Sequence, residues 1–239
     1  HETANNSWMD GAAAHDPATE GLWAVRRDAG VRAWREWLPV STSWFDAYSI
    51  GDLATLFRLE TRLVARSFQL DDAVSAMLAA GDGDLATQLA AFRAGVLADP
   101  ARTMMGADQE RWLADGLKAS VSSGARWQIL AQQVIMGDMR FPDAGAHWFD
   151  GAPPADAEAQ FAARRLLTNA GLPYTYDKWD GYPAARRRLY DSARAANANL
   201  VTLTCDSHNA WAFDLGDESG AIGVEFAGQS VSSHGIERR

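Results

Sequence analysis

Apolar side chains in the first half of the chain recur in patterns that predict a helix, two strands and then further helices. Between residues 21 and 38 they return every three or four positions beside an arginine-bearing face, which is typical of an amphipathic helix. β-Branched and aromatic residues dominate 43–66 and are interrupted at Gly51-Asp52, so we expect two strands joined by a tight turn. The alanine-rich stretch 72–119 is helical in pattern.

The second half alternates between apolar strands and amphipathic helices. A mostly apolar run at 126–136 predicts a buried strand. Helical spacing follows at 155–171, where a glycine ends it, and begins again at Pro183, a residue suited to the first helical position. Short apolar and β-branched runs predict strands at 200–204 and 222–228. This alternation predicts a layered α/β protein, and without an internal repeat or linker we expect one domain.

Composition and charge narrow the classes of function. The chain has 239 residues, of which 47% are hydrophobic and 22% charged, as in ordinary globular proteins. No apolar run approaches the roughly 20 residues that a membrane-spanning helix needs. The net charge of −9 weighs against non-specific binding of nucleic acid, which requires a basic surface. A phosphate-bearing substrate would therefore need a local cation, either an arginine cluster or a bound metal.

The single cysteine, Cys205, excludes an internal disulfide and a multi-cysteine zinc site. The chain begins at His1 rather than Met and shows no signal sequence. We therefore expect either that a leader has been removed or that the chain is part of a longer protein.

The residues that follow the strand at 200–204 are the first candidates for chemistry. Asp206 and His208 come directly after this strand, and ligands of α/β sheets gather beyond the carboxyl ends of strands. A carboxylate and an imidazole two residues apart suit iron, zinc or manganese. The alternative is structural, with Asp206 capping a turn and His208 donating to a backbone carbonyl. The Asp-x-His spacing alone does not decide between them.

Two further segments carry polar candidates. The opening "HETANN" places His1, Glu2, Asn5 and Asn6 close together, where amides could ligate a metal or phosphate and a histidine could protonate a leaving group. An ordinary surface turn is the reading that we favour for this segment. Asp180 lies in a Gly/Pro turn before a basic helix, in "YDKWDGYP".

Arginines form two small groups, at 186–188 and at Arg62 and Arg66. The first group is most simply a solvated helix face, although an arginine at the start of that helix could hold an anion. Arg62 and Arg66 would lie on the same side of a helix and also on the same side of a strand, so their spacing does not distinguish these two structures. Nucleotide-binding glycine loops and the Gly-x-Ser-x-Gly elbow of serine hydrolases are absent from the sequence.

Six stretches in order resemble the PhoD family of alkaline phosphatases and phosphodiesterases, a branch of the calcineurin-like metallophosphoesterases. They span residues 1 to 233 and comprise "HETANN", "RTMMGADQERWLADGL", "RWQILAQQV", "KWDGYPAARRRLY", "CDSHNAWAFDL" and "GVEFAGQSVSS". The resemblance implies a four-layer α/β sandwich of metallophosphoesterase type, of which residues 1–239 would be the C-terminal portion of a single domain. It also implies a metal cluster at the strand ends, with iron and calcium as the metals.

The resemblance also implies roles for individual residues. Asp206 and His208 fall at the family's Gly-Asp-x-His motif, whose Asp and His bind metal. His1 falls at the histidine of Asp-Asp-His-Glu and becomes the candidate for protonating the leaving group. Asn5 falls at the family's asparagine pair as a ligand of metal or phosphate, and Asp180 falls in a turn that borders the substrate pocket.

Two departures from the family pattern stand out. Cys205 occupies the position of the family's glycine, so we expect either a strained loop or a thiol beside the metals. The chain also begins inside a motif, and the family's earlier strands, which provide Asp and Cys ligands, would precede His1.

The function that we expect is metal-dependent hydrolysis of a small phosphoester, in the periplasm or outside the cell by resemblance. The main alternative is a catalytically impaired portion or a non-enzymatic relative that keeps the fold. A metal-dependent esterase or nuclease on the same scaffold is a second alternative, and the acidic charge disfavours action on long nucleic acids.

Overall fold

The computed structural model describes most of the chain, namely residues 4–13, 15–39, 41–80, 84–139, 155–173 and 175–233. His1 lies outside these ranges. Among the described residues, no helix combines the length and the apolar character needed to cross a membrane.

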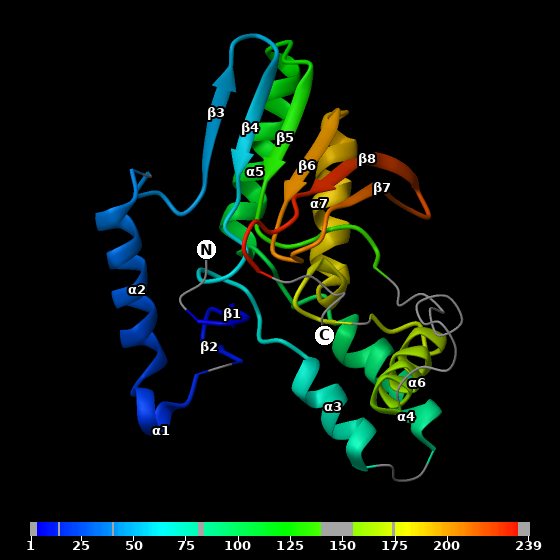
Figure 1. Ribbon diagram of the computed structural model, residues 1–239. Helices are drawn as coiled ribbons and strands as arrows, with labels where there is room; N and C mark the ends of the chain where they lie inside the picture. The colour runs from blue at the N-terminus through cyan, green and yellow to red at the C-terminus, as the bar shows by residue number, and fades with distance from the viewer. Residues whose placement is uncertain are drawn as a thin grey trace.

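A six-stranded sheet organises this part of the chain (Figure 1). In spatial order its strands are β3 (Asp46–Ile50), β4 (Ala54–Arg58), β5 (Trp127–Ala131), β6 (Leu200–Thr204), β8 (Gly220–Ala227) and β7 (Trp211–Asp217). The four central strands are parallel, and the two outer strands pair antiparallel to their neighbours. The carboxyl ends of β4, β5, β6 and β8 therefore meet at one edge of the sheet.

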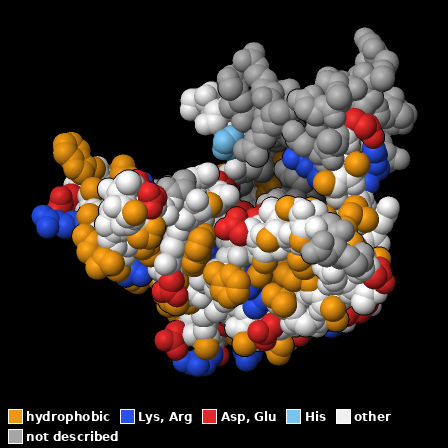
Figure 2. All heavy atoms as spheres, turned by 90° about the horizontal axis from the view of Figure 1, so that it is seen from below, with side chains coloured by type: hydrophobic (Ala, Val, Ile, Leu, Met, Phe, Trp, Pro, Cys, Tyr) orange, Lys and Arg blue, Asp and Glu red, His pale blue; other side chains and the backbone are white. Residues whose placement is uncertain are grey.

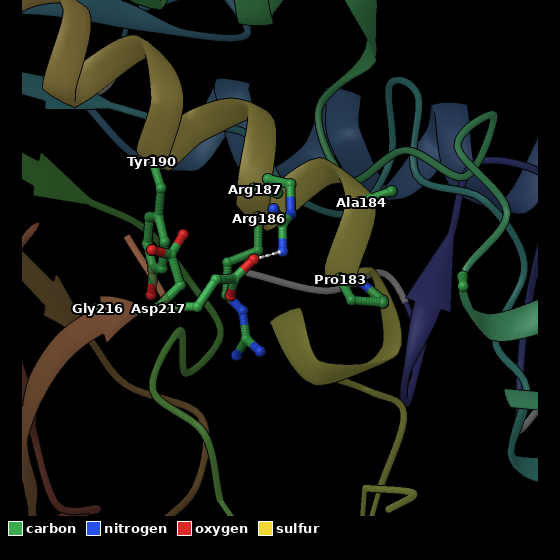
Figure 3. A pocket seen from close by; sticks show the side chains of 9 residues that line it. Pro183, Ala184, Arg186, Arg187, Tyr190, Gly216 and Asp217 are labelled. Atoms are coloured by element: carbon green, nitrogen blue, oxygen red, sulfur yellow. Dashed lines mark hydrogen bonds and ion pairs between the residues drawn. The ribbon is translucent and has the colours of Figure 1, made fainter. Parts of the chain in front are cut away.

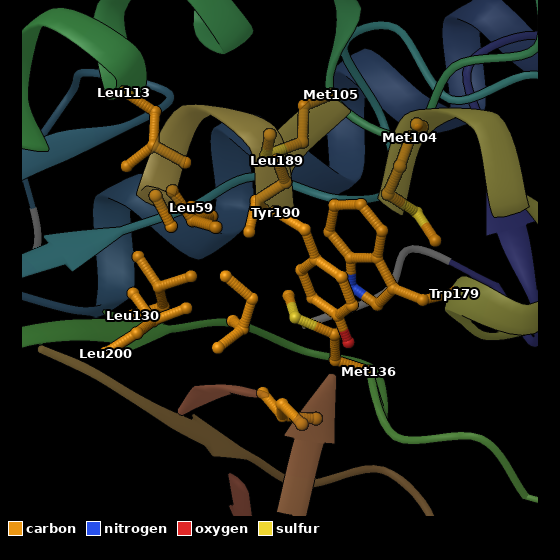
Figure 4. Packing of buried hydrophobic residues seen from close by; sticks show 14 of the residues in the cluster. Leu59, Met104, Met105, Leu113, Leu130, Met136, Trp179, Leu189, Tyr190 and Leu200 are labelled. Carbon is orange, nitrogen blue, oxygen red and sulfur yellow. The ribbon is translucent and has the colours of Figure 1, made fainter. Parts of the chain in front are cut away.

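Helices α5 (Gly106–Ser122) and α7 (Pro183–Ala196) pack on one face of this sheet (Figure 1). Residues of the central strands, Phe57, Leu130 and Leu200 among them, are buried beneath these helices. Leu113 and Leu117 of α5 and Leu189 of α7 complete the main core (Figure 4). Leu113 and Leu117 are 1% and 0% exposed, so α5 buries one face against the sheet.

The opposite face of the sheet is more open among the described residues. Leu203 and Phe226, which are neighbours on β6 and β8, are 42% and 53% exposed. The described residues thus form a mixed α/β structure in which helices pack on one side of a single large sheet. The four-layer sandwich remains a prediction.

The remaining elements surround this body. They are β1 (Ser7–Trp8), β2 (Gly11–Ala12), α1 (Pro17–Glu20), α2 (Trp23–Trp37), α3 (Asp71–Ala80), α4 (Leu85–Phe92), a π-helical turn (Arg93–Leu97), α6 (Ala155–Asn169) and a 3₁₀ turn (Trp179–Gly181). Helix α2 projects from the body, and hydrophobic side chains are visible on that projecting side in Figure 2. Trp23 is its buried residue, whereas Trp37 is 84% exposed.

Most predicted elements are confirmed, with two differences. The strand expected at 126–136 ends at Ala131. Strand β7 was not predicted, although Trp211, Phe213 and Leu215 alternate with smaller or polar residues as in a half-buried strand. The tight turn at Gly51 (φ 54°) and the helix stop at Gly171 (φ 69°) both use left-handed glycines, as expected.

We predict that Gly116→Ala destabilises the protein, although alanine is normally the better helix former by about 1 kcal/mol. A Cβ at Gly116 would lie 2.7 Å from the ring of the buried Phe57, and overpacking costs about 1–3 kcal/mol. Because the propensity gain is common to both variants, the free energy of unfolding from urea titration should be about 1–3 kcal/mol lower for Gly116→Ala than for Gly95→Ala. Gly95→Ala is the control, because a Cβ there meets open space and should be neutral or stabilising. Equal effects of the two variants would contradict this packing.

Candidate active site

Three segments that follow parallel strands lie together at the carboxyl edge of the sheet. They comprise residues 59–66 after β4, 132–139 after β5 and 205–209 after β6. Backbone hydrogen bonds extend the sheet's register into them, from Leu59 N to Ala131 O (2.9 Å) and from Gln132 N to Leu203 O (3.1 Å). This edge is where the parallel strands of an α/β sheet place ligands.

The turn after β6 holds both predicted metal ligands in an uncommon backbone conformation. Asp206 and His208 have φ angles of 73° and 65°, in the left-handed region. This region costs a non-glycine residue about 1–2 kcal/mol. The turn is fixed by hydrogen bonds from Ser207 N to Cys205 O (2.9 Å) and from Ser230 N to His208 O (3.1 Å). Strain that the surrounding structure enforces in this way is typical of functional sites.

The Asp206 carboxylate is bound by a fully buried arginine. Arg62 Nη2 lies 2.5 Å from Asp206 Oδ2, and the Arg62 side chain is 0% exposed. The same guanidinium makes a two-pronged contact with Asp177, at 3.0 Å through Nη1 and 3.1 Å through Nη2. A guanidinium removed from water needs such carboxylate partners, because an unpaired buried charge is very costly.

Asp177 is the centre of this polar cluster. Besides Arg62 it accepts hydrogen bonds from Arg66 Nη2 (2.7 Å) and Gln69 Nε2 (2.7 Å). Gln69 Nε2 also donates to the backbone carbonyl of Asn6 (2.9 Å). The predicted asparagine segment is thus attached to the same cluster as Asp206, although the two are distant in sequence.

A carboxylate and an amide shape the turn that carries Arg62. Glu60 accepts the backbone N–H groups of Arg62 (2.8 Å), Leu63 (2.9 Å) and Val64 (2.9 Å). Gln109 of α5 brackets Glu60 from the other side, accepting from its N–H and donating to its carbonyl at 2.8 Å each. The "GADQERWL" motif, to which the sequence assigned no role, therefore contributes a glutamine that fixes this turn.

The other predicted site residues occupy different surroundings. Asn5 is exposed, next to Asn6 with its left-handed φ of 49°. Asp180 is 6% exposed, and its carboxylate accepts from Met139 N (3.0 Å) and pairs with Arg186 (2.5 Å). Asp180 therefore holds Met139 against the start of α7. His1 lies outside the described residues.

The described residues include two side chains of types that suit a metal, Asp206 and His208. A carboxylate and an imidazole are suitable donors. However, within the described ranges no group of three or more His, Cys, Asp or Glu side chains lies close enough to hold an ion. Arg62 also binds Oδ2 of Asp206. The donor types fit a metal, and further ligands would have to come from elsewhere.

A second layer of charge lies beneath this edge. Lys178 is 4% exposed, 3.8 Å from Asp180, and burial lowers the pKa of its amine to about 8. Glu225 of β8 is 0% exposed and accepts the N–H groups of Met136 (2.8 Å) and Gly137 (2.7 Å). Burial raises the pKa of the Glu225 carboxyl. Together with Asp180, this carboxylate anchors the 136–139 segment beside the site.

Cys205 differs from the expectation of a strained position. It is not among the described residues with positive φ, and the strain lies instead at Asp206 and His208. Its Sγ contacts the carbonyl of Gln133 at 3.6 Å. Partial burial of the sulfur, and then the neighbouring Asp206 charge, raise the pKa of the Cys205 thiol. The thiol therefore stays protonated at neutral pH and is a poor nucleophile.

A separate cleft lies between the start of α7 and the β7–β8 turn (Figure 3). Its volume is about 400 Å³, and its walls include Pro183, Tyr190 and Asp217. An ion pair between Arg187 and Glu218 forms part of its lining. Neither Asp206, His208, Asn5 nor Asp180 lines this cleft, so the cleft is separate from the candidate active site.

Sequence reasoning left Arg62 undecided and missed Asp177, Glu60 and Gln69. Arg62 and Glu60 do have a positional signal, since they follow directly after a parallel strand. Asp177 has none, because it lies in a loop and pairs with Arg62 across 115 residues.

Comparison with known proteins places this geometry in a family. The family model of PhoD-like phosphatases matches residues 1–239. Alkaline phosphatase D of Bacillus subtilis (strain 168) is 34% identical over 143 residues, which cover 57% of this chain and 20% of the relative. A solved structure described as that of PhoD superimposes with a TM-score of 0.65 at 27% identity, covering 98% of this chain and 39% of that one. The chain thus spans well under half the length of both relatives.

We predict that Cys205→Gly does not stabilise the protein. Because Cys205 is not left-handed, glycine gains nothing there and loses the sulfur contact, at a cost of about 0.5–1 kcal/mol. Chemical denaturation of the two proteins side by side measures this difference. A more stable glycine variant would show that the turn needs glycine at this position.

We also predict that Lys178 makes stability increase with pH. Its folded pKa of about 8 lies below the ordinary value of 10.5, so between these values the unfolded chain binds more protons. The free energy of unfolding therefore gains a contribution from Lys178 as pH rises through this window. Urea titrations of wild type and Lys178→Met at about pH 7.5 and about pH 9.5 isolate this contribution, since other groups cancel in the difference. A wild-type advantage that does not grow with pH would contradict the buried amine.

Proposed function

Because the chain belongs to the PhoD-like phosphatase family, we propose that it forms part of an enzyme that hydrolyses small phosphate esters at the Asp206–His208 turn. The observation that carries the proposal is the position and conformation of this turn. Both side chains sit on left-handed residues at the carboxyl edge of four parallel strands, and a buried arginine holds the carboxylate. This is where α/β sheets bind ligands and where enforced strain marks function.

The charges of the polar cluster support metal dependence. Arg62 and Arg66 are both 0% exposed, and Asp177 and Asp206 balance them, so the four groups sum formally to zero. These arginines are therefore committed to carboxylates and offer no net positive charge to a phosphate. We propose that bound metal ions provide it, with iron and calcium as the expected ions.

We assign Asp206, His208 and Asn5 as ligands contributed by this chain. Metals in such sites neutralise phosphoryl charge and make a bound water more acidic. The chain's own residues do the positioning, since Arg62 orients the Asp206 carboxylate and the left-handed turn presents both side chains at the sheet edge. His1 is the proposed proton donor to the leaving group. Asp180 serves substrate binding by holding the 136–139 segment beside the turn.

The open face of the sheet supports the four-layer fold. Parallel sheets are generally covered on both faces, yet Leu203 and Phe226 are 42% and 53% exposed. We propose that residues 1–239 are the later part of one PhoD-like domain, and that a second sheet of that domain packs on this face. Export to the periplasm or beyond the cell belongs to the same proposal and rests on the family resemblance.

We predict that Asp206→Asn and His208→Ala each lower kcat/KM by about 100-fold or more, because each removes a group that holds the reacting phosphate's counter-charge. The assay is hydrolysis of bis-p-nitrophenyl phosphate and p-nitrophenyl phosphate by the purified complete protein that contains this chain, with circular dichroism to check folding. Asp214→Asn, an exposed carboxylate on the neighbouring β7, is the matched control and should keep activity.

Unchanged hydrolysis by both site variants would refute the assignment of the turn. Metal analysis of the same preparations distinguishes the proposed enzyme from the non-enzymatic alternative. An inactive wild-type protein without stoichiometric metal would favour a non-enzymatic relative that keeps the fold.

A further inference from the structure

Arg62 connects three segments that are far apart in the sequence. Its guanidinium contacts Asp206 on the turn after β6, Asp177 in the loop before α7, and the backbone carbonyl of Ser7 (3.3 Å) in the amino-terminal segment. Asp206 and Ser7 lie 144 and 55 residues away along the chain. One side chain therefore sets the relative position of the two segments that carry candidate site residues.

The contacts of Arg62 fix the orientation of its guanidinium and do not merely balance its charge. Asp177 engages both terminal nitrogens of the planar guanidinium, which fixes the rotation of the plane. With that plane fixed, Nη2 points its second contact at Asp206 Oδ2. Lysine, which is a flexible point charge, could not make these contacts together.

The backbone of Arg62 is fixed independently of its side chain. Glu60 binds the N–H of Arg62, and Gln109 of α5 binds the backbone of Glu60 on both sides. Helix α5 thus fixes the position of the Arg62 backbone, and Asp177 fixes the rotation of the guanidinium plane. Because Arg62 is held at both its backbone and its side chain, it in turn orients the Asp206 carboxylate.

Stability alone does not account for such an arrangement. Buried ion pairs generally stabilise no more than well-packed apolar residues of similar volume, because desolvation offsets the attraction. The contacts do, however, hold Asp206 in a left-handed conformation that is unfavourable by itself.

We propose that Arg62 is a positioning residue, which orients the Asp206 carboxylate and ties it to the amino-terminal segment. The catalytic part of this inference rests on the proposed phosphoester hydrolysis, and the structural part does not. Because Asp177 and Asp206 neutralise Arg62, the arginine acts through Asp206 and does not bind the phosphate itself.

The test compares Arg62→Met, Arg62→Lys and the control Arg102→Met. Arg102 is likewise buried, at 4% exposure, but its guanidinium donates to the backbone carbonyls of Phe68 and Gly181. Two quantities are measured for each purified protein. They are kcat and KM for bis-p-nitrophenyl phosphate, and amide hydrogen exchange of peptides covering 203–210 and helix α7.

For Arg62→Met we expect kcat to fall by about 10- to 100-fold while KM stays within about threefold. Exchange should rise about tenfold or more at residues 205–209 and stay unchanged in α7, because the loss is local. Arg62→Lys should recover only part of kcat. Arg102→Met should leave kcat and exchange at 205–209 near wild type.

Three results would overturn the inference. A raised KM with unchanged kcat would mean that Arg62 binds substrate directly. Equal losses in Arg62→Met and Arg102→Met would indicate a general structural role. Unaltered exchange at 205–209 would mean that Arg62 does not order the turn. If the complete wild-type protein that contains this chain hydrolyses no phosphoester, the proposed function fails, and the exchange experiment still decides whether Arg62 orders the turn.

Discussion

The removal of Arg62 from water governs much of the structure around the candidate site. A guanidinium with no exposed surface requires carboxylates at fixed positions, and Asp177 and Asp206 occupy them. That requirement determines where the loop before α7 and the turn after β6 can lie. It also determines where Arg66 and Gln69 point, since both bind the same Asp177 oxygen as Arg62. The polar cluster is consequently a single cooperative unit.

The parallel sheet supplies the frame for this unit. Because β4, β5 and β6 run in one direction, the segments that follow them emerge side by side, which brings Arg62, Gln133 and Asp206 to one edge. Gln133 joins all three segments, since its amide oxygen accepts from Thr61 N (3.2 Å) and its backbone carbonyl accepts from Cys205 N (3.4 Å). Beneath them, the buried Glu225 and Asp180 hold the 136–139 segment. The left-handed turn at Asp206 is tolerated because its surroundings are fixed on every side.

The sequence predicted the elements better than the contacts between them. Strand β6 and the start of α7 at Pro183 were predicted because their signals are local, namely β-branched residues and a proline at the first helical position. The alternation in β7 was equally local but was overlooked beside the Asp-x-His motif. Asp206 and His208 were recognised from their place after a strand and from family resemblance. The pairing of Arg62 with Asp206 spans 144 residues, and no periodicity or spacing reports such a contact.

In the proposed enzyme, the Asp206–His208 turn faces the reacting phosphate. The most direct measurement is a crystal structure of the metal-loaded protein with tungstate, an oxyanion that mimics phosphate and scatters X-rays strongly. We predict that tungstate binds at the carboxyl edge of β6, with a metal ion between the anion and the side chains of Asp206 and His208. Tungstate bound instead in the cleft beside Arg187, with no metal at Asp206, would contradict a role of this turn in phosphoester hydrolysis.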